Sequence, residues 1–131
     1  MNDHKMNEKN RSGFKELDHT ADVSIQIWAD SLEGLFLQGL AGLCYVSGVK
    51  TDSTDEKRKQ KFEVIGFDLE SLLISFLEEC NFQIQHELRV PIVHELEIKN
   101  NHLAWEFTFQ KLTALGTEIK AVTYHNLKVE F

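Results

Sequence analysis

Residues 68–84 read DLESLLISFLEECNFQI and contain the clearest structural pattern of the chain. Asp68 directly precedes a row of apolar residues and suits the N-cap of a helix, because its carboxylate can accept from free backbone N–H groups. The apolar residues recur at steps of three and four and so share one helical face; they are Leu69, Leu72, Leu73, Phe76, Leu77, Cys80 and Ile84. The stretch predicts an amphipathic helix in which Cys80 is a buried, inert thiol.

A second helix is predicted earlier in the chain. Its apolar stripe ends near Val46 and consists of Leu32, Leu35, Phe36, Leu40 and Leu43. Asp30, followed three residues later by Glu33, predicts a capping box at its start. Glycine is unfavourable inside a helix by up to about 1 kcal/mol relative to alanine. We therefore expect a close approach of another backbone, that of a sheet, at Gly34, Gly39 and Gly42.

The remaining patterns indicate strands. Val23, Ile25 and Ile27 alternate with polar residues, as in a strand with one buried side. Residues 47–61 (SGVKTDSTDEKRKQK) have mixed charge without an apolar period and predict a loop, and residues 62–65 predict a short strand.

The carboxyl-terminal half predicts a hairpin and further strands. Apolar alternation after Pro91 predicts a strand with one face formed by Ile92, His94, Leu96 and Ile98. Asn100 and Asn101 suit a tight turn, because asparagine tolerates positive φ. The buried row of the returning strand is Leu103, Trp105, Phe107 and Phe109, and residues 117–131 predict one or two more strands. Together these elements predict an α+β protein with two helices packed on one face of a mostly antiparallel sheet, in one two-layer domain.

Composition limits the function classes. A chain of 131 residues predicts one domain, with residues 1–13 as a polar, mobile segment without a signal sequence. The formal net charge of −7 argues against sequence-independent nucleic-acid binding and against docking on anionic lipid. Two cysteines without a CxxC pair suit a reducing compartment, and no apolar run is long enough to span a membrane. We therefore expect a cytoplasmic protein.

Two polar stretches are candidates for chemistry. Residues 18–22 (DHTAD) place Asp18, His19 and Asp22 where they could ligate a divalent cation, although a solvated turn explains the same residues. Residues 117–125 (TEIKAVTYH) fit an edge strand whose lysine discourages unwanted pairing, with a surface histidine at its end.

Three stretches together resemble the archease family: LDHTADV at 17–23, DLESLLISFLEE at 68–79 and GTEIKAVTYH at 116–125. The resemblance covers residues 14–131. It implies a non-catalytic accessory protein that activates an RtcB-type RNA ligase in tRNA splicing. Such a protein promotes guanylylation of the ligase, which uses GTP, and supports multiple turnover. We expect it to meet tRNA only through the ligase.

The resemblance also implies the site residues. Asp22 is the expected ligand of a divalent cation, calcium, and the expected partner-facing or activating residues are Lys120, Asp18, His19, Glu118 and His125. Archeases usually close with a further strand that ends in a ligating aspartate, and the sequence given ends in KVEF without one, so we expect either a truncated chain or a degenerate metal site. We therefore expect weak calcium binding. The alternatives are a binding or chaperone-like module with a degenerate metal site and, less well supported, a metal-dependent hydrolase.

Overall fold

The computed structural model describes residues 11–17, 24–119 and 122, except for the side chains of residues 53–56. Its elements in chain order are β1 (Gly13–Leu17), β2 (Ser24–Trp28), α1 (Leu32–Ser47), β3 (Lys50–Ile65), α2 (Leu69–Gln85), β4 (Arg89–Lys99) and β5 (His102–Ala114). Among these residues, no helix is long and apolar enough to cross a membrane. Most of the predicted mobile segment, residues 1–10, lies outside the description, and Gly13 already belongs to β1.

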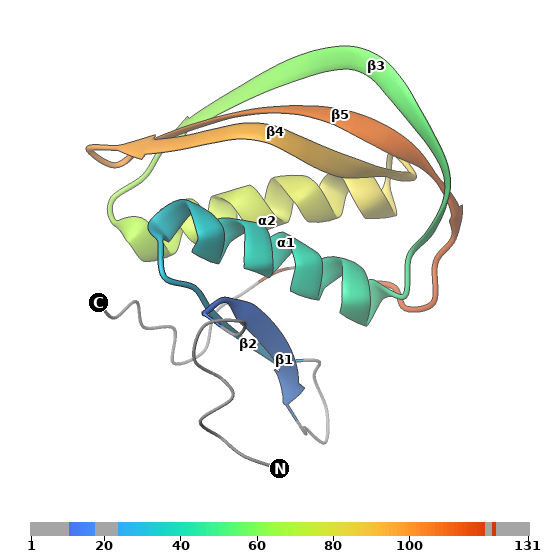
Figure 1. Ribbon diagram of the computed structural model, residues 1–131, viewed down its shortest axis with the longest axis horizontal. Helices are drawn as coiled ribbons and strands as arrows, with labels where there is room; N and C mark the ends of the chain where they lie inside the picture. Colours follow the sequence, from blue (N-terminus) through green and yellow to red (C-terminus); the bar gives the residue numbers. More distant parts are fainter. Residues whose placement is uncertain (1–10, 18–23, 120–121, 123–131) are drawn as a thin grey trace.

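The predicted α+β class is confirmed. Both helices lie against one side of a three-stranded antiparallel sheet with the order β3-β5-β4 (Figure 1). β1 and β2 form a separate antiparallel hairpin that packs on α1. The described strands therefore form two sheets with the helices between them, where the sequence predicted two layers. The reason lies in α1: Gly42 leaves room for side chains of the hairpin, since a Cβ there would lie 2.6 Å from Cδ1 of Ile25.

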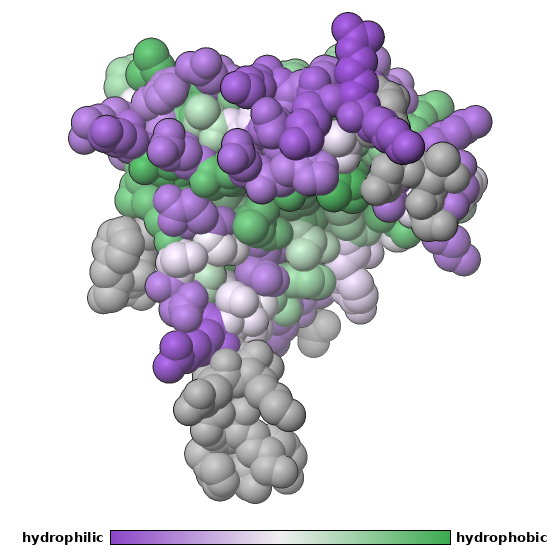
Figure 2. All heavy atoms as spheres, turned by 45° about the horizontal axis from the view of Figure 1, so that its top comes forward, coloured by the Kyte–Doolittle hydropathy of each residue, from purple (hydrophilic) through white to green (hydrophobic). Residues whose placement is uncertain are grey.

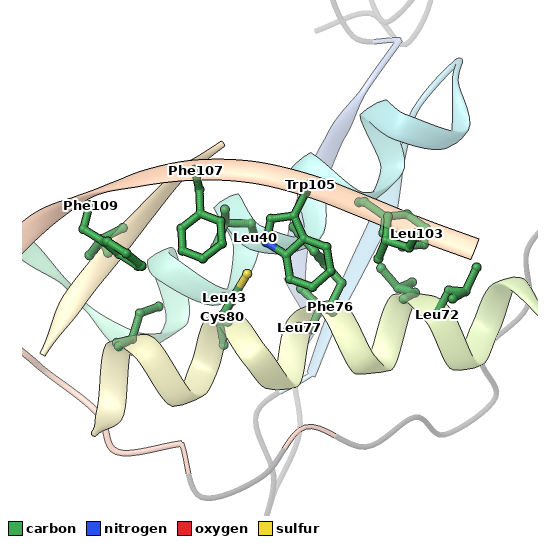
Figure 3. Close-up of a cluster of buried hydrophobic side chains, with 14 residues drawn as sticks. Leu40, Leu43, Leu72, Phe76, Leu77, Cys80, Leu103, Trp105, Phe107 and Phe109 are labelled. Carbon is green, nitrogen blue, oxygen red and sulfur yellow. The ribbon is translucent and has the colours of Figure 1, made fainter. Parts of the chain in front are cut away.

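The core lies between α2 and β5, as predicted. Leu72, Phe76 and Ile84 of α2 are completely buried. Figure 3 shows side chains of β5 pointing toward this face of α2; the buried ones are Leu103, Trp105, Phe107 and Phe109. The rings of Phe76 and Trp105 meet edge to face, with centroids 5.2 Å apart. Asp68 caps α2, and its side chain accepts from the backbone N–H of Ser71, which confirms the predicted helix start.

The predicted cap of α1 is wrong by one residue. Ser31 is the N-cap, and its Oγ accepts from the backbone N–H of Gly34 at 3.0 Å. Glu33 consequently lies two residues after the cap, where it cannot complete a capping box with Asp30. The helix itself ends at Ser47, next to the predicted Val46.

The loop predicted at residues 47–61 is also wrong. Residues 50–65 form one long strand, β3, which pairs with β5 along its length. β3 lies at the edge of its sheet, where charged residues are tolerated and even favoured. Its register with β5 shifts three times, so no regular apolar alternation could mark it in the sequence.

A β-bulge in β4 changes which side chains face the core, so the predicted alternation does not hold along the whole strand. The register with β5 shifts between Val93 and Glu95, and Val93 packs toward the core together with Leu96 and Ile98. His94 is exposed instead, and its Nε2 lies 2.8 Å from Oγ1 of Thr108. One extra residue in the strand reverses which side chains point inward. The predicted row of Ile92 and His94 with Leu96 is therefore wrong.

The turn between β4 and β5 is as predicted, since Asn100 and Asn101 have φ angles of 52° and 63°. The strands predicted at residues 117–131 receive no support from residues 117–119 and 122, which lie in no strand. The other residues of that stretch lie outside the description.

Candidate functional site

Most of the predicted site lies outside the described residues, namely Asp18, His19, Asp22, Lys120 and His125. Glu118 is described and exposed. Within residues 11–17, 24–119 and 122, no group of three or more His, Cys, Asp or Glu side chains could hold a metal ion. The assignment of Asp22 to calcium therefore stays a prediction.

The structure describes how the chain enters each of the two candidate stretches. Leu17 is paired with Ser24 at the loop end of the β1–β2 hairpin, so residues 18–23 connect two paired strands. Gly116 and Thr117 precede Lys120, and their backbone N–H groups both donate to the carbonyl oxygen of Ser47, at 2.9 and 3.0 Å. The second stretch therefore begins at a fixed point on the carboxyl end of α1.

Two glycines meet at this fixed point. Gly48 ends α1 with φ of 63°, a left-handed conformation that favours glycine. Its N–H donates to carbonyl oxygens of the last helical turn. A Cβ on Gly48 would lie 3.2 Å from Cα of Gly116, so the two backbones are in close contact. A residue without a side chain is therefore needed at position 48, whereas a Cβ on Gly116 would lie 3.4 Å from Cα of Gly48, an ordinary contact distance.

A second fixed point lies on α2. Nδ2 of the buried Asn81 donates to the carbonyl oxygen of Ile119 at 2.9 Å. Ile119 and Val122 both pack against the hydrophobic core. The described residues on either side of Lys120 and Ala121 thus pack against the core, and Ile119 is also hydrogen-bonded to α2.

Sequence reasoning missed the role of Asn81. The sequence contains a sign of this role, because Asn81 follows Leu77 by four residues and so lies beside the apolar stripe of α2. A polar side chain at such a position needs a hydrogen-bond partner when it is buried. The partner lies 38 residues away in the sequence, and no local pattern identifies it.

The two cysteines offer no nucleophile. Burial raises the pKa of the Cys44 thiol to about 11. Burial raises the pKa of Cys80 well above its usual range, and the neighbouring Cys44 adds to this effect. Both thiols are therefore protonated near neutral pH, and the thiolate is the reactive form. The predicted burial of Cys80 is confirmed.

Comparison with known proteins identifies the family. The model of the archease protein family matches residues 14–131, nearly the whole chain. The chain belongs to the archease family. Among curated archeases, that of Methanopyrus kandleri is 32% identical over 130 residues, which cover 89% of each chain. The archease of Danio rerio is 35% identical, with 88% of this chain and 76% of the relative covered.

Two solved structures are similar to this archease. A crystal structure of an archease from Thermotoga maritima, described as a possible chaperone, is 27% identical with a TM-score of 0.62, and the match covers 89% of this chain and 86% of the other. The solution structure of Methanobacterium thermoautotrophicum protein 1598 has a TM-score of 0.63 at 24% identity, with 87% and 86% covered, and shows the fold alone. Archeases are generally non-catalytic accessory proteins.

Proposed function

We propose that this archease activates an RtcB-type RNA ligase in tRNA splicing or RNA repair. In this role it promotes guanylylation of the ligase, which uses GTP, and allows multiple turnover. The observation that carries the proposal is the family match over residues 14–131, which includes all three motif stretches. The net charge of −7, taken over the whole chain, supports a protein partner more than direct work on RNA.

Lys120 is the central residue of the proposal. A lysine ammonium group acts as a compact point charge toward a carboxylate or a phosphate. Such a charge is most effective when its surroundings are fixed before the partner arrives. The hydrogen bonds of Gly116 and Thr117 to Ser47, and of Asn81 to Ile119, support this requirement. The further residues proposed to face the ligase are Asp18, His19, Glu118 and His125.

Substitution of Lys120 by alanine tests the proposal. A hydrogen bond to a charged group contributes about 1.5–3 kcal/mol, so activation should fall by about 10- to 100-fold. The measurement is multiple-turnover ligation by the cognate ligase at a fixed archease concentration. Lys99→Ala, an exposed lysine of β4, is the matched control and should activate normally. Equal activation by the wild type and Lys120→Ala would show that the Lys120 side chain is not needed for activation of the ligase.

A chaperone-like binding module is the second candidate. It is favoured by the description of the Thermotoga maritima archease as a possible chaperone. A module of this kind would reduce aggregation of the ligase on heating, measured by light scattering, without changing turnover of ligase that is already folded. An archease that accelerates turnover of pre-folded ligase would contradict this candidate.

We also propose that Asp22 binds a divalent cation, with calcium as the first choice. A carboxylate is the type of ligand that calcium prefers, and affinity increases with the number of charged ligands. Asp22 and Asp18 supply few such ligands, so we expect weak binding. Calorimetric titration with calcium alone should show about a tenfold loss of affinity in Asp22→Asn. Asp30→Asn, an exposed aspartate, should bind like the wild type. Unchanged binding by Asp22→Asn would contradict the assignment.

A further inference from the structure

The edge strand β3 contains an unusually wide bulge. Glu56 is paired with Phe109 and Gln60 with Phe107, so the three residues 57–59 lie opposite Thr108 alone. Bulges of this kind interrupt the ladder and re-aim side chains, and they often occur at sheet edges. We call residues 57–61 the basic bulge, because four of its five residues are cationic.

The cations of the basic bulge are concentrated, and one of them has an ion pair with a described carboxylate. They are Lys57, Arg58, Lys59 and Lys61, all exposed. Nζ of Lys59 lies 3.5 Å from Oε1 of Glu106. These four residues are more than a quarter of the 14 lysines and arginines in a chain of net charge −7.

The surroundings of the basic bulge are polar. Figure 2 shows hydrophilic side chains gathered over the outer side of the three-stranded sheet. The exposed apolar residues nearest in the sequence are Ile65, the last residue of β3, and Phe67, which follow Lys61 by four and six residues. Cores of protein–protein interfaces are poor in lysine and rich in aromatic residues. The basic bulge therefore does not resemble the centre of a protein interface.

Protection of the sheet edge explains some of these charges but not their grouping. A single lysine or a bulge is enough to discourage edge-to-edge pairing. Here three consecutive cations occupy a bulge that already breaks the ladder, and Lys61 extends the group. Clustered lysine and arginine side chains without base-reading or apolar neighbours are typical of contacts to the phosphates of nucleic acids.

We propose that the basic bulge binds the phosphate backbone of RNA. The choice of RNA among polyanions rests on the proposed function, in which the ligase holds tRNA. This proposal replaces the expectation that the archease meets tRNA only through the ligase. The net charge of −7 belongs to the whole chain, whereas the direct contact would use the local cations of β3. Binding of this kind carries no sequence preference and is sensitive to salt.

Fluorescence anisotropy with a labelled tRNA transcript tests this proposal. The triple variant Lys57→Gln, Arg58→Gln, Lys59→Gln removes three cations of the bulge. Each phosphate contact contributes about 0.7–0.9 to the slope of log K against log salt, so the slope should decrease by about 2–3. At a salt concentration of about 50 mM we expect affinity to fall by about tenfold or more. The matched control removes the same charge from three separate exposed sites, with Lys15→Gln, Lys50→Gln and Lys99→Gln.

Three outcomes would overturn the proposal. The wild type does not bind the transcript at this low salt concentration, or the control variant loses as much affinity as the bulge variant. The third is that the bulge variant binds RNA normally but no longer co-sediments with the ligase, which would make the bulge a protein contact. Thermal melting establishes that both variants are folded.

The test is separate from that of the proposed function. Lys120→Ala should lose activation and keep RNA binding. If the wild type binds RNA through the bulge but does not activate the ligase, the proposed function fails and the RNA contact stands.

Discussion

Truncation of Leu77 to alanine should lower the free energy of unfolding by about 2–5 kcal/mol. Leu77 is 7% exposed and lies on the face of α2 that meets α1. A Cβ on Gly39 of α1 would lie 3.1 Å from Cδ2 of Leu77, so the leucine fills the space that this glycine leaves. Removal of the side chain leaves a cavity between two helices that other contacts hold in place, and such cavities collapse only partly.

Urea unfolding of the wild type and of Leu77→Ala measures this loss of stability. Glu78→Ala, at the next and exposed position of α2, is the matched control and should change stability by less than about 0.5 kcal/mol. A double-mutant cycle with Gly39→Ala adds a sharper test. The methyl group added at position 39 crowds the leucine side chain but has room once that side chain is truncated, so the double variant should be more stable than the sum of the single effects indicates. A loss below about 0.5 kcal/mol in Leu77→Ala would contradict the packing described for α2.

The parts of the fold that the sequence predicts correctly are those with a regular apolar period. The stripe of α2 and the alternating row from Leu103 to Phe109 each face one continuous core, so burial and sequence period coincide. The Asn100–Asn101 turn is predictable for a different reason, because few residues tolerate positive φ.

The errors in the predicted strands come from irregular pairing. β3 has one face in water, lies at a sheet edge and contains a bulge of three residues, so its composition is that of a loop. The register of β4 shifts between Val93 and Glu95. Val93 packs on the core before the shift, and Leu96 and Ile98 pack on it afterwards, so no single alternation describes the strand. A bulge depends on pairing with the neighbouring strand, and the period of a single strand does not contain that information.

The candidate site is predictable only in part for a related reason. A run such as DHTAD has the same composition as an ordinary polar turn. It is the family resemblance that favours a cation site over such a turn. The attachment of residues 116–119 to Ser47 and Asn81 joins parts of the chain that lie tens of residues apart. Such tertiary hydrogen bonds have no sequence period, although the buried asparagine of α2 is a detectable sign of one.

Gly48→Ala should destabilise the protein by about 2–4 kcal/mol and reduce ligase activation. The left-handed conformation costs alanine about 1–2 kcal/mol relative to glycine. The new Cβ would also lie 3.2 Å from Cα and 3.3 Å from the backbone nitrogen of Gly116, and overpacking of this kind costs about 1–3 kcal/mol. The neighbour is backbone, so relief requires movement of Gly116 away from α1. That movement would weaken its hydrogen bond to Ser47 and shift the start of the segment that leads to Lys120.

Two further variants separate the effect of the positive φ at position 48 from the effect of the contact with Gly116. Gly48→Asn tolerates positive φ better than alanine but carries the same Cβ, so it should keep the loss of activation with a smaller loss of stability. Gly116→Ala places its Cβ 3.4 Å from Cα of Gly48, an ordinary contact distance, and should be nearly neutral in both measurements. Urea unfolding gives the stability, and multiple-turnover ligation at a temperature where every variant is folded gives the activation. If Gly48→Ala loses stability but activates like the wild type under these conditions, the Gly48–Gly116 contact supports the fold alone, and the position of Lys120 does not depend on it.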